Sequence, residues 1–204
     1  PLGKDDHGGV EVGRHRGRGT ASGAALLLDG VVDRMWDKEL PDPWTQAVAI
    51  SGDRMWAGTL RGLVRLTPWS ILTDGPPSVY TLSPTKEGRL WAGIGGLRAV
   101  DREGVVSSVL ALEGDRIYDV AVDDQVWIAS QNGGLQTWKE DGTVYPSDVS
   151  LGSAFSLAKG PAGWWVAGGS QGLLGPFGQV VGYADGLPGR SVWSVAADSD
   201  GTSL

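Results

Sequence analysis

Short segments in which apolar and polar residues alternate recur along the chain, and residues typical of turns separate them. Leu63-Val64-Arg65-Leu66 alternates between apolar and polar side chains, as expected for a strand with one buried face. Gly, Pro and Asp residues interrupt these segments at regular intervals. No stretch keeps the period of about 3.6 residues that marks a helix. The pattern therefore predicts an all-β protein with almost no helix.

One strand–turn–strand phrase occurs four times in the chain. The full copies are Asp53–Leu66, Gly88–Val100, Asp124–Gln136 and Gly163–Leu174. Each copy carries a tryptophan at the same place, namely Trp56, Trp91, Trp127 and Trp165. These tryptophans are 35, 36 and 38 residues apart. A weaker copy, Gly19–Leu27, has Gly17 where the others have tryptophan. A period in this range predicts a repeat architecture.

A second phrase precedes each tryptophan and supplies one more strand per repeat. Its copies are residues 40–50, 76–82, 115–122, 153–157 and 185–195. Each repeat then has a first, inner strand such as Ala47–Ile50 and a second strand that carries the tryptophan. A third strand such as Leu63–Leu66 and a weaker, outer strand such as Trp69–Leu72 follow. Four antiparallel strands in a repeat of this length are typical of one blade of a β-propeller.

The tryptophans form the predicted structural core of this propeller. A lone blade exposes both of its faces, so successive blades must stack to bury Trp56, Trp91, Trp127 and Trp165. The sequence predicts an irregular N-terminal segment at residues 1–15 and β-propeller repeats at residues 16–204. The predicted repeat units, about five in number, cover residues 17–55, 56–90, 91–126, 127–164 and 165–204.

Composition excludes several classes of function. The chain has 204 residues and a net charge of −7, with acidic and basic residues interspersed. Nucleic acid is therefore not an expected partner, because binding it needs a clustered basic surface, and we interpret the basic residues at 14–18 as a solvated N-terminal segment. The absence of cysteine excludes thiol chemistry and cysteine-based metal sites. The longest apolar run, Ala24–Leu28, is too short for a membrane segment.

The sequence offers few residues for catalysis. His7 and His15 are the only histidines, and both lie in the weakly patterned N-terminal region, so a Ser-His-Asp triad is not expected. Asp198-Ser199-Asp200-Gly201 resembles the start of a calcium loop, but a hairpin turn explains it better because no glutamate follows. We therefore predict a protein that is not an enzyme and that has no metal or cofactor.

Binding residues are expected in the loops at one face of the propeller. In this fold the loop before each inner strand and the turn between the second and third strands surround the mouth of the axial channel. The candidate residues of these loops are Asp42, Trp44, Arg61, Asp115, Arg116, Gln131, Asn132, Gln171 and Arg190. We expect this rim to bind a small polar ligand or a partner protein. The alternative is that the turns are polar only because they are exposed.

Taken together, the phrases resemble the two-component regulator propeller repeat. Its motif reads approximately Leu-Pro, a Val/Ile strand, Asp-Gly, Leu-Trp-Val/Ile-Gly-Thr, two variable residues and Gly-Leu. Residues 53–66 match this motif closely and residues 88–100 nearly as well. The copies at 124–136 and 163–174 depart from it at Ser130 and Gly169 in place of threonine, at Ala129 in place of glycine, and at the longer turn of Asn132-Gly133.

The resemblance implies a seven-bladed propeller, often doubled, in the periplasmic sensor part of bacterial histidine kinases or diguanylate cyclases. It implies a non-enzymatic ligand-binding sensor that is periplasmic or extracellular and that signals to a domain absent from this chain. The alternatives are a structural or protein-interaction propeller of a secreted or surface protein and, as a weaker alternative, a propeller lyase or hydrolase. With four full units and two partial ones, the chain is expected to be a fragment of a larger ring. A closed five-bladed ring is the alternative, with residues 16–36 and 191–204 sharing one blade.

Overall fold

The computed structural model describes residues 3–4, 10–12, 15–75, 77–111, 115–146 and 151–197. Within these ranges the regular structure is β-strand apart from a single 3₁₀ turn, η1 (Tyr183–Asp185). The described residues include no helix that is both long and apolar enough to cross a membrane. The predicted all-β class is confirmed. His7 and residues 198–204, which hold the predicted turn at 198–201 and part of the ring-closing strand, lie outside the described residues.

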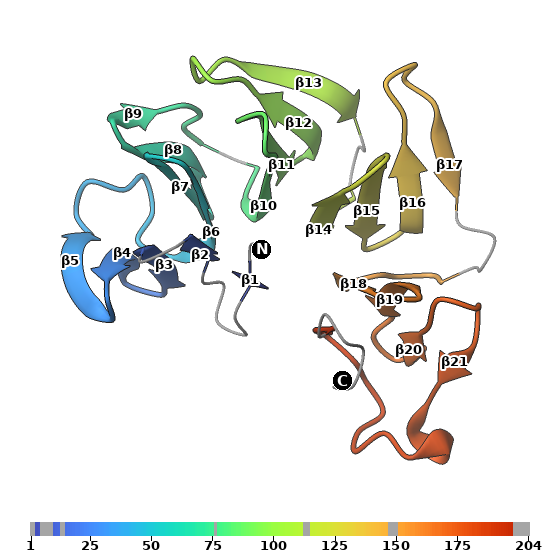
Figure 1. Ribbon diagram of the computed structural model, residues 1–204. Helices are drawn as coiled ribbons and strands as arrows, with labels where there is room; N and C mark the ends of the chain where they lie inside the picture. The colour runs from blue at the N-terminus through green and yellow to red at the C-terminus, as the bar shows by residue number, and fades with distance from the viewer. Residues whose placement is uncertain are drawn as a thin grey trace. The chain divides into compact units, whose positions relative to one another are not determined.

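The strands form five antiparallel sheets, here called blades 1 to 5, in which each strand pairs with the next one in sequence (Figure 1). Blade 1 contains β1 (Gly3–Lys4), β2 (Val10–Val12), β3 (His15–Thr20), β4 (Gly23–Leu28) and β5 (Val31–Trp36). Blade 2 contains β6 (Thr45–Ser51), β7 (Arg54–Thr59), β8 (Gly62–Thr67) and β9 (Trp69–Ile71). Blade 3 contains β10 (Val79–Pro84), β11 (Leu90–Ile94), β12 (Gly96–Val100) and β13 (Val106–Ala111).

The remaining two blades follow the same plan. Blade 4 contains β14 (Ile117–Val122), β15 (Val126–Ser130), β16 (Gly134–Trp138) and β17 (Val144–Pro146). Blade 5 contains β18 (Ser156–Gly160), β19 (Gly163–Ala167), β20 (Leu173–Leu174) and β21 (Val180–Val181). Blades 2 to 5 thus have the four-stranded meander predicted for a propeller blade.

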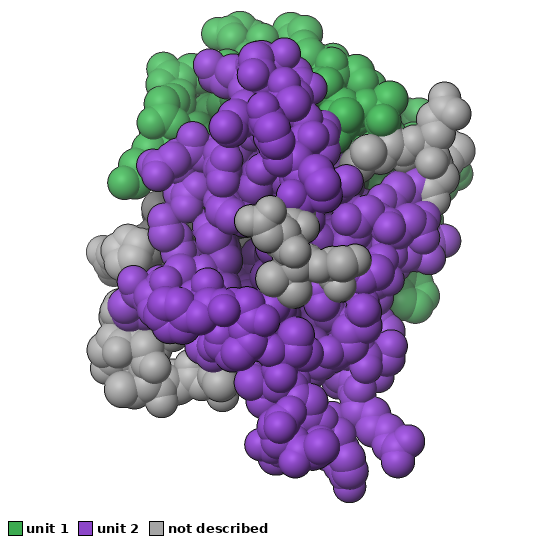
Figure 2. Space-filling view, turned by 90° about the vertical axis from the view of Figure 1, so that its right-hand side faces the viewer, with its two compact units in different colours: residues 1–114 green, residues 115–204 purple. Residues whose placement is uncertain are grey.

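The chain divides into two compact units, residues 1–114 with blades 1 to 3 and residues 115–204 with blades 4 and 5 (Figure 2). Inside unit 1, β6 contacts both β3 and β10, and inside unit 2, β14 contacts β18. The contacts at β6 with β10 and at β14 with β18 join the first strands of successive blades. This is the relation expected of inner strands in a propeller.

The blade boundaries differ from those expected from the repeat. Repeat units counted from each tryptophan begin at the second strand, whereas blades 2 to 5 begin at their first strands, with Thr45, Val79, Ile117 and Ser156. At the N-terminus, residues 1–15 were expected to be irregular. The structure instead has β1 and β2 there, with β2 paired antiparallel to both β1 and β3.

The turn between the second and third strands explains two residues of the repeated phrase. Thr59 Oγ1 accepts a hydrogen bond from the Arg61 amide (3.1 Å) and donates one to the Gly62 carbonyl (3.0 Å). Gly62 has a φ of 134°, and a Cβ there would collide with the Thr73 carbonyl, so glycine is required. Blade 1 repeats this geometry at Thr20, whose hydroxyl bonds the Ser22 amide and the Gly23 carbonyl. The turn of the weak copy at 19–27 therefore folds as the turn of blade 2 does.

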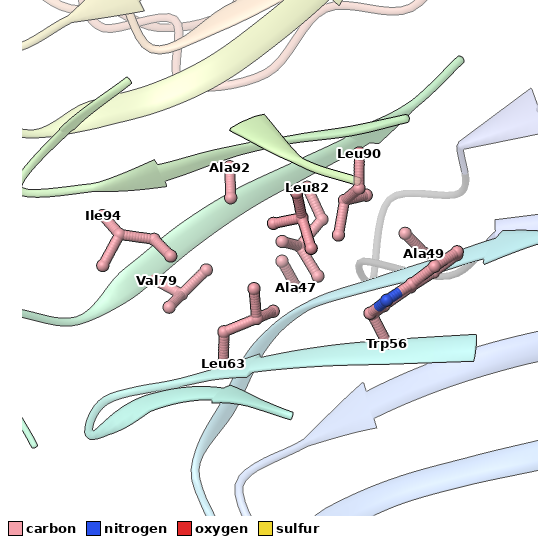
Figure 3. Packing of buried hydrophobic residues seen from close by; sticks show 10 residues of the cluster. Ala47, Ala49, Trp56, Leu63, Val79, Leu82, Leu90, Ala92 and Ile94 are labelled. Atoms are coloured by element: carbon pink, nitrogen blue, oxygen red, sulfur yellow. The ribbon is translucent and has the colours of Figure 1, made fainter. Parts of the chain in front are cut away.

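Blades 2 and 3 pack through one cluster of buried apolar residues to which both blades contribute small and large side chains (Figure 3). Trp56 is 2% exposed and shares a core cluster with Ala49 of its own blade and Leu90 of blade 3. Gly58 stands so close to blade 3 that a Cβ would lie 2.5 Å from Val79 Cγ1. The glycine that follows the tryptophan strand thus lets the next blade approach, and burial of the aromatic ring stabilises the contact.

The junction between blades 1 and 2 shows how the missing tryptophan is compensated. A Cβ at Gly17 would lie 2.7 Å from Val48 Cγ1 and 3.0 Å from Met55 Cε, so side chains of blade 2 occupy the space above it. Met55 and Trp36 are both nearly fully buried in the cluster between these blades. The flexible methionine fills the volume that an aromatic ring occupies in the other blades.

The repeat tryptophans of unit 2 are less buried than the repeat tryptophans of unit 1. Trp127 and Trp165 were predicted as core residues together with Trp56 and Trp91, but both are only partly buried. Trp127 packs against Trp164 of blade 5, with ring centroids 5.5 Å apart. Trp164 comes just before the repeat tryptophan, as Leu90 does in blade 3. At the junctions of blades 2 and 3 and of blades 4 and 5, the residue before the repeat tryptophan thus lies in the same core region as the repeat tryptophan of the preceding blade.

Candidate functional site

The predicted binding loops of blade 4 meet at one end of the blade. The Asp115 carboxylate, just before β14, accepts hydrogen bonds from the amides of Asn132 (2.9 Å) and Gly133 (3.1 Å) in the β15–β16 turn. The Gln131 amide donates to the Arg116 carbonyl (2.9 Å). The first-strand loop and the second turn are therefore adjacent, as expected of the propeller rim, and Asp115 holds the turn in place.

The same network continues into blade 5. Ser153 Oγ donates to the Gln131 carbonyl (2.6 Å), and the Ala154 amide donates to the Ser130 carbonyl (2.9 Å). Gln171 Oε1, in the β19–β20 turn, accepts from the amides of Gly152 (2.6 Å) and Ser153 (3.3 Å). These bonds tie two turns and two loops into one polar surface, which we call the unit 2 rim. Its described residues are Asp115, Arg116, Gln131, Asn132, Ser153 and Gln171.

Three aromatic side chains lie in contact beside this rim. The rings of Tyr118 and Phe155 have centroids 4.9 Å apart, and those of Phe155 and Trp193 are 4.6 Å apart in an edge-to-face arrangement. The Tyr118 hydroxyl donates to Gln131 Oε1 (3.2 Å), which joins these aromatics to the rim. Trp193 is 63% exposed, whereas Tyr118 and Phe155 are half-buried. We call these three residues the aromatic row.

The members of the row come from the first-strand phrases: Tyr118 is the second residue of β14, Phe155 immediately precedes β18, and Trp193 follows Val192, which forms an isolated bridge with Gly169. In blade 4, Ile117 pairs with Ser130 and Asp119 with Ala129, so Tyr118 is the extra residue of a β-bulge. A bulge re-aims the side chain of its extra residue. The buried Asp119 carboxylate accepts a hydrogen bond from the Leu157 amide of blade 5 (3.0 Å). This bond links the first strands β14 and β18 and helps to fix their relative position.

Sequence reasoning missed the aromatic row, although a signal for it was present. When the first-strand phrases are aligned, the residue after the first apolar position is aromatic four times. These residues are Tyr80, Tyr118, Phe155 and Trp193. Blade 2 has Gln46 there, so the signal is incomplete. The bulge that makes this position special cannot be read from residue spacing, because it depends on strand pairing.

The other predicted site residues are not part of the unit 2 rim. Asp42, Trp44 and Arg61 belong to unit 1. The Asp42 carboxylate accepts from the Trp44 amide (2.8 Å), and the Trp44 carbonyl accepts from the Leu60 amide (3.3 Å), while the Trp44 ring is 53% exposed. The Arg61 side chain is exposed. Arg190, in unit 2, places its guanidinium over the ring of Tyr183 at 5.7 Å from the centroid.

A second polar cluster lies at the opposite end of β14. Lys159 Nζ is 2.7 Å from Asp123 Oδ2, and Trp127 Nε1 donates to Asp123 Oδ1 (3.0 Å). Burial alone would raise the pKa of Asp123, but hydrogen bonds from Lys159, Trp127 and Gln125 outweigh it and lower that pKa below its usual value. The hydrogen bond to Asp123 raises the pKa of Lys159. Because this pair joins blades 4 and 5, we assign it a structural role.

The chemistry that the rim offers is hydrogen bonding and contact with aromatic faces. Backbone amides hold the side chains of Asp115 and Gln171, the Tyr118 hydroxyl bonds the side chain of Gln131, and the row adds the exposed indole of Trp193. Within the described ranges, no three Asp, Glu or His side chains come together in a way that could hold a metal ion. His15 is the first residue of β3 in blade 1 and His7 lies outside the described residues, and both are far in sequence from the loops of the unit 2 rim.

The stacked four-stranded blades and their polar, aromatic rim define a β-propeller. Known structures with this fold align with nearly the whole chain. The extracellular domain of BT4673 from B. thetaiotaomicron, a protein described as a one component system, is 19% identical with a TM-score of 0.73, over 95% of this chain and 30% of that one. A streptogramin B lyase is 14% identical with a TM-score of 0.68, over 96% of this chain and 72% of that one.

A third similar structure is PorZ of Porphyromonas gingivalis, a bacterial surface component of the type-IX secretion system. It is 15% identical with a TM-score of 0.65, and the match covers 93% of this chain and 35% of that one. No protein-family model matches the sequence, and a comparison with curated proteins finds no match either. At these identities the likeness shows the fold alone. The chain spans about a third of the BT4673 chain that it matches.

Proposed function

We propose that this chain is a non-enzymatic ligand-binding module of a bacterial signalling protein and that it lies outside the cytoplasm. The observation that carries the proposal is the aromatic row beside a rim whose polar groups are already fixed. The likeness to the extracellular domain of BT4673 and the resemblance of the repeats to the two-component regulator propeller motif both support a signalling role.

The ligand we propose is a small polar molecule with one flat or apolar face. Its flat face would contact Trp193 and Phe155, and its polar groups would bond the rim at Gln131 and Gln171. Since the rim is held by hydrogen bonds such as those from Gly152 to Gln171 and from Ser153 to Gln131, little ordering would be needed on binding. Binding would then bias a partner domain absent from this chain.

A screen with matched variants tests this proposal. The purified chain is screened against a library of small polar extracellular metabolites by thermal shift, and each hit is retested with Phe155→Ala and Trp193→Ala. We expect at least one hit whose affinity falls about tenfold or more in both variants, because aromatic contacts contribute roughly 1–3 kcal/mol in well-packed sites. Phe177→Ala is the matched control, since Phe177 is exposed and lies outside the row.

Two results would contradict the proposal. One is a screen without any saturable hit. The other is a set of hits whose affinity is the same for the wild type, Phe155→Ala and Trp193→Ala, because the row would then have no part in binding.

A protein-interaction role on the cell surface is the second candidate. The likeness to PorZ and the exposed indole rings of Trp44 and Trp193 favour it. A lyase activity has less support, although a streptogramin B lyase shares the fold, because no rim loop contains a histidine that could act as general acid or base.

A further inference from the structure

A cavity in unit 1 lies where blade 2 meets blade 3, and its volume is about 170 Å³. One wall is the loop 73–75, which follows β9, together with Pro77. The other wall is built by Ile94 at the end of β11, Arg98 of β12 and Val106 of β13. All of these residues belong to unit 1, so the cavity is separate from the unit 2 rim.

The loop wall of this cavity is held by hydrogen bonds to blade 2. Thr73 Oγ1 accepts from the Leu63 amide (2.9 Å), and the Thr73 amide donates to the Leu63 carbonyl (3.1 Å). The Gly75 amide donates to the Arg61 carbonyl (2.8 Å). Because both ends of the loop wall are fixed to the β7–β8 turn and to β8, the cavity is formed before any ligand arrives.

Arg98 is an unusual residue for its place in the repeat. It follows the Gly-Leu pair of the phrase, where blade 2 has Val64, blade 4 has Gln136 and blade 5 has Leu174. Val64 and Leu174 are buried apolar residues. Blade 3 therefore puts a guanidinium where two other blades put a core side chain, at a cost in desolvation unless a partner is present.

The guanidinium of Arg98 is only partly used by the protein. Its Nε donates to the Ile94 carbonyl (3.3 Å), which fixes the plane of the group against β11. A guanidinium carries five N–H donors, so a single bond leaves the Nη donors available for a further acceptor. Arg98 is partly buried. Solvent should therefore screen an ion pair between Arg98 and a ligand less than it screens an ion pair of an exposed arginine.

We propose that this cavity binds a small organic monocarboxylate with a compact apolar body. The carboxylate would accept hydrogen bonds from the Arg98 Nη atoms, which match it in geometry and charge. The apolar body would lie against Ile94, Val106 and Pro77. Asp74 on the facing wall carries a negative charge, which disfavours polyanions such as inorganic phosphate. An engineered cavity of roughly 150 Å³ in another protein holds benzene, so a benzoate-sized molecule fits the volume.

Titration with benzoate, followed by amide NMR on the full chain, tests the assignment. We expect saturable shifts centred on Gly75, Ile94, Arg98 and Val106. Arg98→Val, which installs the side chain found at the same place in blade 2, should weaken benzoate binding about tenfold or more. Arg54→Val is the matched control. It removes an arginine from the start of β7, at the other end of the strand from the β7–β8 turn, and should leave the affinity for benzoate unchanged.

A neutral probe and an inorganic probe test separately the role of the carboxylate and the role of the apolar body of the ligand. Benzyl alcohol should bind weakly and equally to the wild type and Arg98→Val, and inorganic phosphate should bind more weakly than benzoate. The assignment is overturned if benzoate causes no saturable shift, if folded Arg98→Val binds it as well as the wild type, or if phosphate binds as tightly. The unit 2 rim is untouched by these variants, so failure here would leave the proposed function standing.

Discussion

Single residues of the repeated phrase have separable physical tasks. Thr59 and Thr20 close the turn through their hydroxyl groups, and Gly62 allows the backbone to pass the Thr73 carbonyl. Gly58 permits the approach of blade 3, while Trp56 fills the contact. The tryptophan, glycine and threonine residues that carry the resemblance therefore serve turn geometry and blade stacking. They do not determine which ligand the protein binds.

Gly58→Ala should destabilise unit 1. The added methyl group would stand 2.5 Å from Val79 Cγ1 and 3.1 Å from the Val79 carbonyl, so the blades must separate slightly. Overpacking of this kind costs roughly 1–3 kcal/mol in the free energy of unfolding, measurable by urea denaturation. Gly189→Ala is the control, since a Cβ there meets open space. An unchanged midpoint for Gly58→Ala would contradict the proposed close approach.

Trp91→Ala tests the role of the repeat tryptophan in the core. Trp91 is 3% exposed, and truncation of a buried aromatic side chain costs about 3–5 kcal/mol in the free energy of unfolding. Trp69→Ala removes a side chain of β9 that is 41% exposed and should cost less. Equal losses of stability in the two variants, measured by chemical denaturation, would refute a core role for Trp91.

The Asp123–Lys159 pair predicts a specific dependence of stability on pH. The pKa of Asp123 is lowered in the folded protein, so its contribution is present above the unfolded pKa and is lost as pH falls through the folded one. The pKa of Lys159 is raised, so its contribution persists below the unfolded pKa and is lost as pH rises through the folded value. Because Lys159 is well exposed, the pair contributes at most about 1 kcal/mol.

The Asp123→Asn variant tests directly whether the stabilisation by Asp123 is lost as the pH falls. The difference in unfolding free energy between the wild type and Asp123→Asn should be constant between about pH 6 and 8 and should shrink below about pH 4. The measurement is urea denaturation across that pH range. A difference that grows on acidification would show that the carboxylate is not stabilised by its partners.

At the scale of elements, the hairpins were predictable and their registers were not. The second and third strands of blades 2 to 4 lie where the alternating pattern and the Gly-Leu pair place them, because turn chemistry is local. The aromatic row depends on a bulge at Tyr118, and the cavity depends on a loop from blade 2 meeting Arg98 of blade 3. Such features come from strand pairing and blade stacking, which residue spacing does not encode.

Only the part of the candidate site that follows from blade topology could be predicted from the sequence. The expectation that first-strand loops adjoin the second turns holds at Asp115 and Gln131, since both follow from blade topology. The position of Arg190 could not be predicted, because its guanidinium lies over the ring of Tyr183 in η1, a contact that the repeat does not encode. The partial exposure of Trp127 and Trp165 was also missed, because the repeat shows which residues are equivalent but not how well each blade is covered.

Gln171→Ala should loosen the loop at the start of blade 5. The Gln171 side-chain carbonyl is the acceptor for the Gly152 and Ser153 amides, and losing it removes roughly 1 kcal/mol of local stability. Hydrogen exchange at the Gly152 amide should accelerate about fivefold. The Gly75 amide, held by the Arg61 carbonyl in unit 1, is the internal reference. Unchanged exchange at Gly152 would mean that the side chain does not hold the loop.

At the scale of the whole molecule, repetition separates stability from recognition. The tryptophan and the Gly-Leu pair recur in every full copy, apart from small shifts in turn length, and they form the hairpins that stack in neighbouring blades, as in other repeat architectures. Residues that differ between the copies include the rim side chains and Arg98, and the position that forms the aromatic row holds Gln46 in blade 2 and a tyrosine, phenylalanine or tryptophan in the other copies. A propeller can therefore change its ligand by changing these positions without altering the contacts that hold its blades together.

The most direct test of the central claim is aromatic ¹³C NMR of the chain during titration with a screened ligand. We expect the ring signals of Tyr118, Phe155 and Trp193 to shift together and to saturate at the same ligand concentration, while the ring signals of Trp69 do not shift. Binding at the aromatic row would be contradicted if the ring signals of all three residues stayed unchanged at a saturating ligand concentration.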